Sequence, residues 1–190
     1  MRLIAGLGNP GRPYVDSRHN IGFSLVKYLA GRHKGSFKKE DSIAAFSAKI
    51  KIGRETVVLA MPVTFMNLSG TAVGALLKKY RLNPGRLLVV CDDLDLGLGR
   101  IKLRGSGSSG GHRGLESVIV NLASRNFDRL RLGIGRPPQG IEPAEYVLEA
   151  FTRKEKEIIG VLIERAAVCC ESWVNNGLTE TMNIFNKRSV

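Results

Sequence analysis

Four polar residues that can take part in hydrolysis follow three apolar segments of the chain. Asn9 and His19 come after the first segment, Asn67 after the second and Asp92 directly after the third. An imidazole can take a proton from water, a carboxylate can orient the imidazole and stabilise its charged form, and amides can hold a developing oxyanion. Because open α/β sheets bind ligands beyond the carboxyl ends of their strands, we expect these side chains to meet at one rim and to support hydrolysis.

Each of these residues also has a purely structural explanation. Asn9 stands in an Asn-Pro-Gly turn, where asparagine is a common turn residue. His19 and Asn67 precede helical patterns and can serve to begin those helices. Asp92 can cap a turn, and either of the two aspartates that closely follow it can take its place if the strand register differs.

Strand and helix patterns alternate along the chain. Short apolar runs predict buried strands at 3–7, 57–61 and 87–91, and alternating residues predict half-exposed strands at 47–52, 98–104 and 129–134. Helical periods lie at 21–29, 73–80 and 159–173. Asn20 is expected as the N-cap of the first helix and Gly31 as its end. The alternation predicts an α/β sandwich.

Positive charge is concentrated on the half-exposed strands. The chain has 29 Lys and Arg against 17 Asp and Glu, a formal net charge of +12, which attracts polyanions such as nucleic acid or an acidic membrane surface. Side chains alternate between the two faces of a strand, so each predicted strand turns its cations to one side, namely Arg100, Lys102 and Arg104 on one strand and Arg129 and Arg131 on another. This placement favours a phosphate-binding surface over the alternative, an ordinary solvated strand face.

Length and cysteine content exclude several protein classes. A chain of 190 residues can bury a core of its own, so one domain that needs neither disulfides nor a structural metal is expected. Cys91, Cys169 and Cys170 form no Cys-x-x-Cys pattern and are expected in the core. The sequence has no long apolar run and no leader of the secretory kind, so we expect a cytoplasmic protein without a membrane span.

Three short patterns resemble known site motifs, but the chain lacks the other residues that each motif needs. The stretch 6–11 fits the dinucleotide fingerprint, but Pro13 interrupts the required helix and residues 26–33 lack the ribose-binding acid, which disfavours a nicotinamide or flavin enzyme. Gly-Ser-Ser-Gly-Gly at 107–111 fits the hydrolase elbow around Ser109, but no histidine follows His112 to complete the triad. The three histidines lack the spacing of a catalytic zinc site.

Six segments in a fixed order resemble the bacterial peptidyl-tRNA hydrolase family, and they span nearly the whole chain, at 6–11, 14–22, 65–70, 92–95, 110–115 and 129–135. The resemblance implies hydrolysis of the ester that joins a peptide to the 3′ end of tRNA. It also implies one α/β domain over 1–190, with a mostly parallel, mixed and twisted sheet flanked by helices. By the same resemblance the protein is a monomer that needs no metal and no cofactor.

The resemblance also assigns roles to site residues. His19 corresponds to the general base for water, Asp92 to the acid that orients it, and Asn9 and Asn67 to the amides at the ester or peptide carbonyl. The remaining substrate-binding positions are Tyr14, Met66, His112 and Arg113. The positions that correspond to tRNA contacts are Lys102, Arg104 and Arg131, of which the two arginines match the pair that grips the 5′ phosphate of the acceptor stem.

The main departure from the family is Arg113, because the family commonly has asparagine there. An arginine offers donors but no acceptor, so it can bind a phosphate or an oxyanion but cannot accept a proton from water as an amide oxygen does. The leading alternative is a catalytically silent RNA-binding homologue. The presence of His19, Asn67 and Asp92 together argues against it, and Arg113 argues mildly for it. A nucleotide-binding oxidoreductase is a weaker alternative. The glycine- and serine-rich stretch 105–111 is expected to be a mobile loop beside the site.

Overall fold

A mixed seven-stranded sheet forms the centre of the molecule. The computed structural model describes residues 1–187, and the strand order is β2-β3-β4-β1-β5-β7-β6. The four central strands are parallel, namely β4 (Glu55–Pro62), β1 (Arg2–Gly6), β5 (Leu87–Asp93) and β7 (Asp128–Gly133). The edge strands pair in the antiparallel sense, with β2 (Lys38–Lys39) and β3 (Ala45–Ile52) at one side and β6 (Ile101–Arg104) at the other. The predicted α/β class is confirmed.

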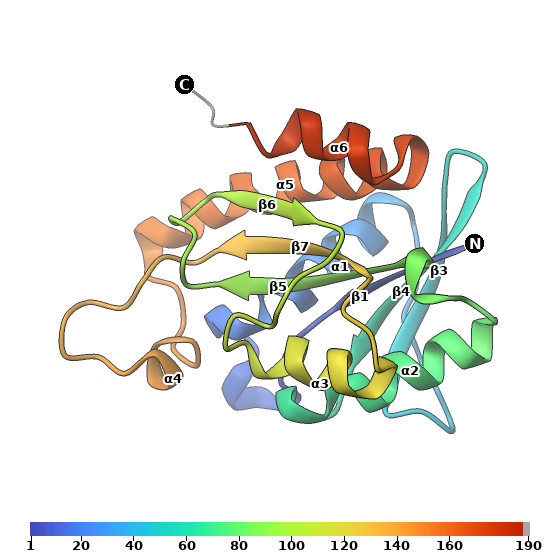
Figure 1. Ribbon diagram of the computed structural model, residues 1–190. Helices are drawn as coiled ribbons and strands as arrows, with labels where there is room; N and C mark the ends of the chain where they lie inside the picture. The colour runs from blue at the N-terminus through green and yellow to red at the C-terminus, as the bar shows by residue number, and fades with distance from the viewer. Residues whose placement is uncertain (188–190) are drawn as a thin grey trace.

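Helices cover both faces of this sheet (Figure 1). One core lies between the sheet and α1 (Ile21–Arg32) with α5 (Arg153–Asn176), and α6 (Leu178–Phe185) packs against α5 and β6. The other core lies under α2 (Ser69–Tyr80) and α3 (Arg113–Leu122). Shorter elements form the connections: the 3-10 turns η1 (Arg12–Tyr14), η2 (Arg18–Asn20), η3 (Met66–Leu68) and η4 (Pro84–Arg86), and helix α4 (Pro143–Tyr146).

The apolar runs identified in the sequence form the central strands. Every residue of β5 is buried, as are four of the five residues of β1, because helices cover both faces of the parallel strands. Helix α1 differs from the prediction at both ends. It continues through Gly31 to Arg32, and Asn20 stands at the N-cap position while its side chain bonds Asn9 instead of capping the helix.

Two glycines let helix α1 lie directly against strand β1. A Cβ on Gly6 would stand 2.2 Å from the carbonyl oxygen of Gly22, and one on Gly22 would stand 2.5 Å from the backbone of Leu7. Gly6 in the stretch 6–11 therefore serves close helix–strand packing, and the following turn, η1, replaces the phosphate-binding helix of a dinucleotide site. This packing fixes η2, which carries His19, beside the ends of the central strands.

The cationic strand faces form only in part as predicted. Lys102 and Arg104 on β6 point away from the buried Ile101 and Leu103, as expected. Arg129 is only 2% exposed, so its assignment to an exposed row was wrong. Its guanidinium donates to the carbonyl oxygens of Gly107 (2.8 Å) and Ser108 (3.2 Å), and it therefore braces the glycine-rich loop from inside.

The three cysteines are buried and unpaired, as predicted. Burial raises the pKa of Cys169 to about 12, so this thiol stays protonated at neutral pH. Within residues 1–187 no helix has the length and apolar content that a membrane span requires. The assignment of a single domain to residues 1–190 stays a prediction, and its last three residues lie outside the described part.

Candidate active site

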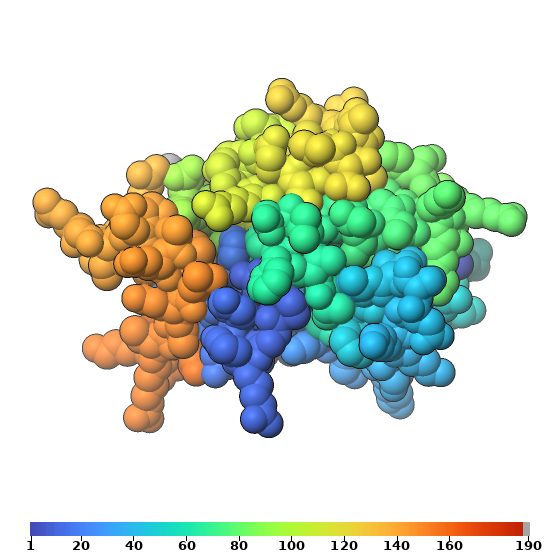
Figure 2. Space-filling view, turned by 90° about the horizontal axis from the view of Figure 1, so that it is seen from below, coloured from blue at the N-terminus to red at the C-terminus, as the bar shows by residue number. Residues whose placement is uncertain are grey.

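A pocket of about 780 Å³ opens where the central parallel strands end. Figure 2 shows a recess between the orange segment around residues 140–150 and the yellow-green segment around 105–115. Most of the residues assigned from the sequence line it, together with part of the chain around α4: Asn9, His19, Met66, Asn67, Asp92, His112, Arg113, Arg131, Pro143, Ala144, Val147 and Leu148.

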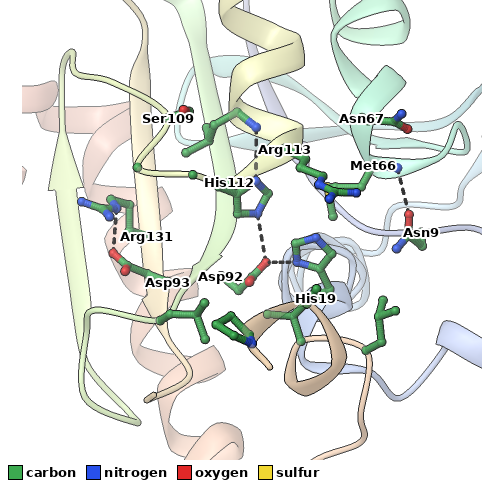
Figure 3. A pocket seen from close by; sticks show the side chains of 18 of the residues that line it. Asn9, His19, Met66, Asn67, Asp92, Asp93, Ser109, His112, Arg113 and Arg131 are labelled. Atoms are coloured by element: carbon green, nitrogen blue, oxygen red, sulfur yellow. Dashed lines mark hydrogen bonds and ion pairs between the residues drawn. The ribbon is translucent and has the colours of Figure 1, made fainter. Parts of the chain in front are cut away.

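One carboxylate oxygen contacts two imidazoles in this pocket (Figure 3). Nδ1 of His19 lies 2.7 Å from Oδ1 of Asp92, and Nε2 of His112 lies 3.0 Å from the same oxygen. The ring centroids of the two histidines are 4.9 Å apart. The Asp92 side chain is 3% exposed and that of His19 is 11% exposed, so the imidazole borders the pocket while the carboxylate is enclosed.

The hydrogen bonds of His112 determine which of its two ring nitrogens carries the proton. Its Nδ1 accepts from the backbone N–H groups of Gly114 (3.1 Å) and Leu115 (3.2 Å), and so caps the start of helix α3. A neutral imidazole has one acceptor nitrogen and one donor nitrogen, so Nε2 of His112 carries the proton and donates it to Asp92. The sequence placed His112 beside the site, and the structure adds that it ties Asp92 to helix α3.

The contact with Asp92 leaves His19 with one free nitrogen. Nδ1 of His19 donates to the carboxylate, so in the neutral ring Nε2 holds the lone pair. This nitrogen makes no hydrogen bond within the described part of the chain. Burial raises the pKa of Asp92, but the two adjacent imidazoles together lower it by more. The net pKa therefore lies well below that of an ordinary aspartate. An ionised, enclosed carboxylate beside an imidazole is suited to a general base.

The same three residues have the ligand types of a metal site. Their possible ligand atoms lie within 4.8 Å of one another. A metal must bind a nitrogen lone pair, and the single lone pair of a neutral His112 ring already accepts the N–H groups of Gly114 and Leu115. Binding a metal at Nε2 would therefore require removal of its proton or loss of the helix cap, so this donor set suits proton transfer better than metal binding.

Asn9 is held in one orientation by three hydrogen bonds. Its Oδ1 accepts from the backbone N–H of Met66 at 2.8 Å, and its backbone exchanges bonds of 2.7 and 3.0 Å with the side chain of Asn20. Because Oδ1 is engaged, Nδ2 of Asn9 presents its two N–H groups on the other side of the amide (Figure 3). Asn67 also lines the pocket, and its side chain makes no hydrogen bond to any described residue.

Residues 147–149 are joined to the turn that carries His19. The backbone N–H of His19 donates to the carbonyl of Val147 at 2.8 Å, and that of Arg18 donates to Glu149 at 2.9 Å. The Arg18 guanidinium lies 4.0 Å from the centre of the Tyr146 ring. It is also within 3.0 Å of Glu155 on α5. This arrangement fixes both the backbone of His19 and one wall of the pocket.

Three of the assigned binding residues do not line the pocket. Tyr14 lies in η1 outside it, and its substrate contact stays a prediction. Lys102 and Arg104 lie on the neighbouring edge strand β6, where Lys102 stands directly opposite Arg131 of β7. The pocket and the cationic strands therefore share Arg131 as a common member.

Two residues that hold the site have roles that the sequence did not reveal. Asn20, expected as a helix cap, holds Asn9, and Asp93, considered only as a substitute for Asp92, pairs with Arg131 at 2.7 Å. The only signal in the sequence was that Asn20 follows His19 and Asp93 follows Asp92. This adjacency could not show where the two side chains point, because successive residues at a strand end point to different sides.

Comparison with known proteins identifies the family. The family model described as "Peptidyl-tRNA hydrolase" matches residues 3–190. This chain belongs to the peptidyl-tRNA hydrolase family. A peptidyl-tRNA hydrolase from Syntrophomonas wolfei is 44% identical over 186 residues, which cover 98% of this chain and 100% of the relative. One from Herpetosiphon aurantiacus is 47% identical over 187 residues, 98% of this chain and 90% of the relative.

The fold agrees with that of solved peptidyl-tRNA hydrolases. The crystal structure of the peptidyl-tRNA hydrolase from Acinetobacter baumannii matches with a TM-score of 0.92 at 34% identity, and covers 98% of this chain and 94% of that chain. The family resemblance inferred from the six segments is thus confirmed over the full length. The roles of individual residues rest on the geometry described above.

Proposed function

We propose that this chain hydrolyses the ester bond of peptidyl-tRNA with His19 as the general base, and releases free tRNA and peptide. The observation that carries the proposal is the 2.7 Å contact of His19 with an enclosed, ionised Asp92 at the rim of the pocket. It leaves Nε2 of His19 directed away from the carboxylate and able to accept a proton. Membership of the family supplies the substrate class.

In the proposed reaction, Nε2 of His19 takes a proton from a water molecule while the oxygen of this water attacks the carbonyl carbon of the ester. Asp92 stabilises the imidazolium that forms, because its charge lies next to Nδ1. The carbonyl oxygen becomes an oxyanion, for which the free N–H groups of Asn9 and Asn67 are suitable donors. The intermediate collapses as the 3′ oxygen of the terminal ribose leaves and takes the proton from His19.

The acceptor stem has a matching surface beside the pocket. Arg131 stands at the pocket wall, Lys102 lies opposite it on β6, and Arg104 follows two residues later on the same strand face. Cations on a flat strand pair attract a phosphate backbone without regard to sequence. In this proposal the three residues hold the stem, with its 5′ phosphate at the two arginines, while the 3′ end enters the pocket.

Release of N-acyl amino acid from N-acylated aminoacyl-tRNA tests this function. The proposal expects multiple turnovers that persist when a chelator is added, since proton transfer is assigned to His19 and Asp92 and oxyanion stabilisation to amide N–H groups. Salt-sensitive binding of tRNA without release would instead support a silent RNA-binding homologue. Complete loss of activity in chelator, with tRNA still folded and bound, would contradict the metal-independent mechanism.

A further inference from the structure

A second acid beside the pocket, Asp93, holds the guanidinium of Arg131. Oδ2 of Asp93 lies 2.7 Å from Nε of Arg131, and Oδ1 of Asp93 accepts the backbone N–H of Asp95 at 2.8 Å. The Asp93 side chain is 3% exposed, while that of Arg131 is 26% exposed. Figure 3 shows this pair at one side of the pocket, apart from His19, Asp92 and His112. Oδ1 thus accepts a hydrogen bond, whereas Oδ2 has an ion pair with Arg131 and no hydrogen-bond partner among the described residues.

This contact engages only one edge of the Arg131 guanidinium. Neither terminal nitrogen of Arg131 has a hydrogen bond or ion pair with the described residues, so Nη1 and Nη2 are free for a ligand. Gly110 of the glycine-rich loop lies beside them, because a Cβ built on it would stand 3.5 Å from Nη2. Lys102 faces the same residue from β6. The two free nitrogens therefore lie next to a backbone segment without a side chain, and Lys102 is on the same face of the strand pair.

An ion pair at Nε restricts the orientations that the Arg131 guanidinium can adopt. Two parallel N–H bonds from one arginine match two oxygens of a phosphate, but only if the plane of the guanidinium is correctly oriented. A free arginine side chain loses rotamer entropy when it binds, and an internal carboxylate that fixes it beforehand removes part of that cost. Burial raises the pKa of Asp93, and the backbone N–H of Asp95 and the charge of Arg131 act in the opposite direction.

We propose that Asp93 is a positioning residue that orients Arg131 to bind a terminal phosphate group, and so sets the preference of this surface for a 5′-phosphorylated acceptor stem. The inference rests on the proposed function for its ligand, but not for its geometry. Without Asp93, Arg131 keeps its charge and still attracts any phosphate of the backbone. What it loses is the fixed direction that distinguishes a terminal phosphate, with three accessible oxygens, from an internal one with two.

The test compares tRNA with and without its 5′ phosphate. The ratio of the two dissociation constants is measured for the wild type and for Asp93→Asn, with deacylated tRNA so that catalysis is not needed. We expect Asp93→Asn to lower this ratio by about 3- to 10-fold, as a charge-assisted contact loses its orientation. Asp41→Asn, an exposed change of the same charge in the turn between β2 and β3, is the matched control and should leave the ratio unchanged.

A second comparison shows whether Asp93 acts through Arg131. In an Arg131→Ala background, Asp93→Asn should have no further effect on the ratio, because the two changes remove the same interaction. Equal ratios for the wild type and Asp93→Asn, or a wild type that does not distinguish the two tRNAs, would overturn the inference. Failure of the wild type to hydrolyse its substrate would overturn the proposed function alone, since the binding ratio does not depend on turnover.

Discussion

His112 and His19 share one oxygen of Asp92, but only His19 keeps a nitrogen free for chemistry. The Nδ1 atom of His112 is occupied by two N–H groups at the start of helix α3, whereas Nε2 of His19 has no partner among the described residues. Two histidines at similar distance from one acid therefore have different roles. One fixes the carboxylate to the helix, and the other can accept a proton.

Replacement of Asp92 by asparagine should change the acid sensitivity of folding. The pKa of Asp92 is lowered in the folded chain, so its ionised form stabilises the fold above the pKa of the unfolded state, and this stability is lost as the pH falls toward the folded pKa. Between pH 5 and pH 3 the wild type should lose roughly 1 kcal/mol more unfolding free energy than Asp92→Asn. Urea denaturation at both pH values measures this difference, and equal losses would show that the environment of Asp92 does not favour its charge.

Removal of Arg104 and Arg131 should weaken tRNA binding and leave the catalytic step largely intact. Each lost phosphate contact reduces the magnitude of the slope of log affinity against log salt by roughly 1. For the double alanine variant this magnitude should therefore fall by roughly 2. The control is Lys38→Ala with Lys39→Ala, which removes the same charge from the exposed strand β2 at the other edge of the sheet. A similar salt slope in both double variants would mean that net charge, not this surface, binds the tRNA.

Arg113→Asn introduces the residue that the family resemblance leads us to expect at this position. Arg113 lines the pocket and has no hydrogen bond or ion pair with the described residues, so its guanidinium is available to substrate phosphate. We expect KM to rise by about 3- to 10-fold with kcat changed by less than about 3-fold, and Arg113→Lys to retain most of the affinity. Steady-state kinetics on the two variants measure this. A large fall in kcat at constant KM would instead place Arg113 at the transition state.

The sequence was sufficient to predict the central strands, because their continuous apolar runs are typical of strands that are buried on both faces. It also located His19 and Asp92, since both follow such strands and so reach the same rim. It failed for Arg129, because strand alternation gives the face of a side chain but not what covers that face. The glycine-rich loop and Phe127 enclose Arg129, and these contacts depend on tertiary structure.

The orientation of amides and imidazoles could not be predicted either. Asn20 matches a helix cap by position, and only the approach of the Asn9 turn shows that its side chain is used elsewhere. For His112, the sequence showed a histidine before a helix, but its protonation follows from the simultaneous contacts with Asp92 and with the helix N–H groups. Such roles are set by two partners distant in the chain, which local patterns do not contain.

The most direct test of the account is single-turnover hydrolysis of N-acylated aminoacyl-tRNA by His19→Ala, with enzyme in excess. The rate should fall by about 10²- to 10⁴-fold, the usual contribution of a general base, while the affinity for deacylated tRNA stays within about 2-fold of the wild type. His33→Ala is the matched control, because this histidine pairs with Glu171 away from the pocket and its loss should leave the rate unchanged. A near-normal single-turnover rate for His19→Ala would contradict the assignment of His19 as the base.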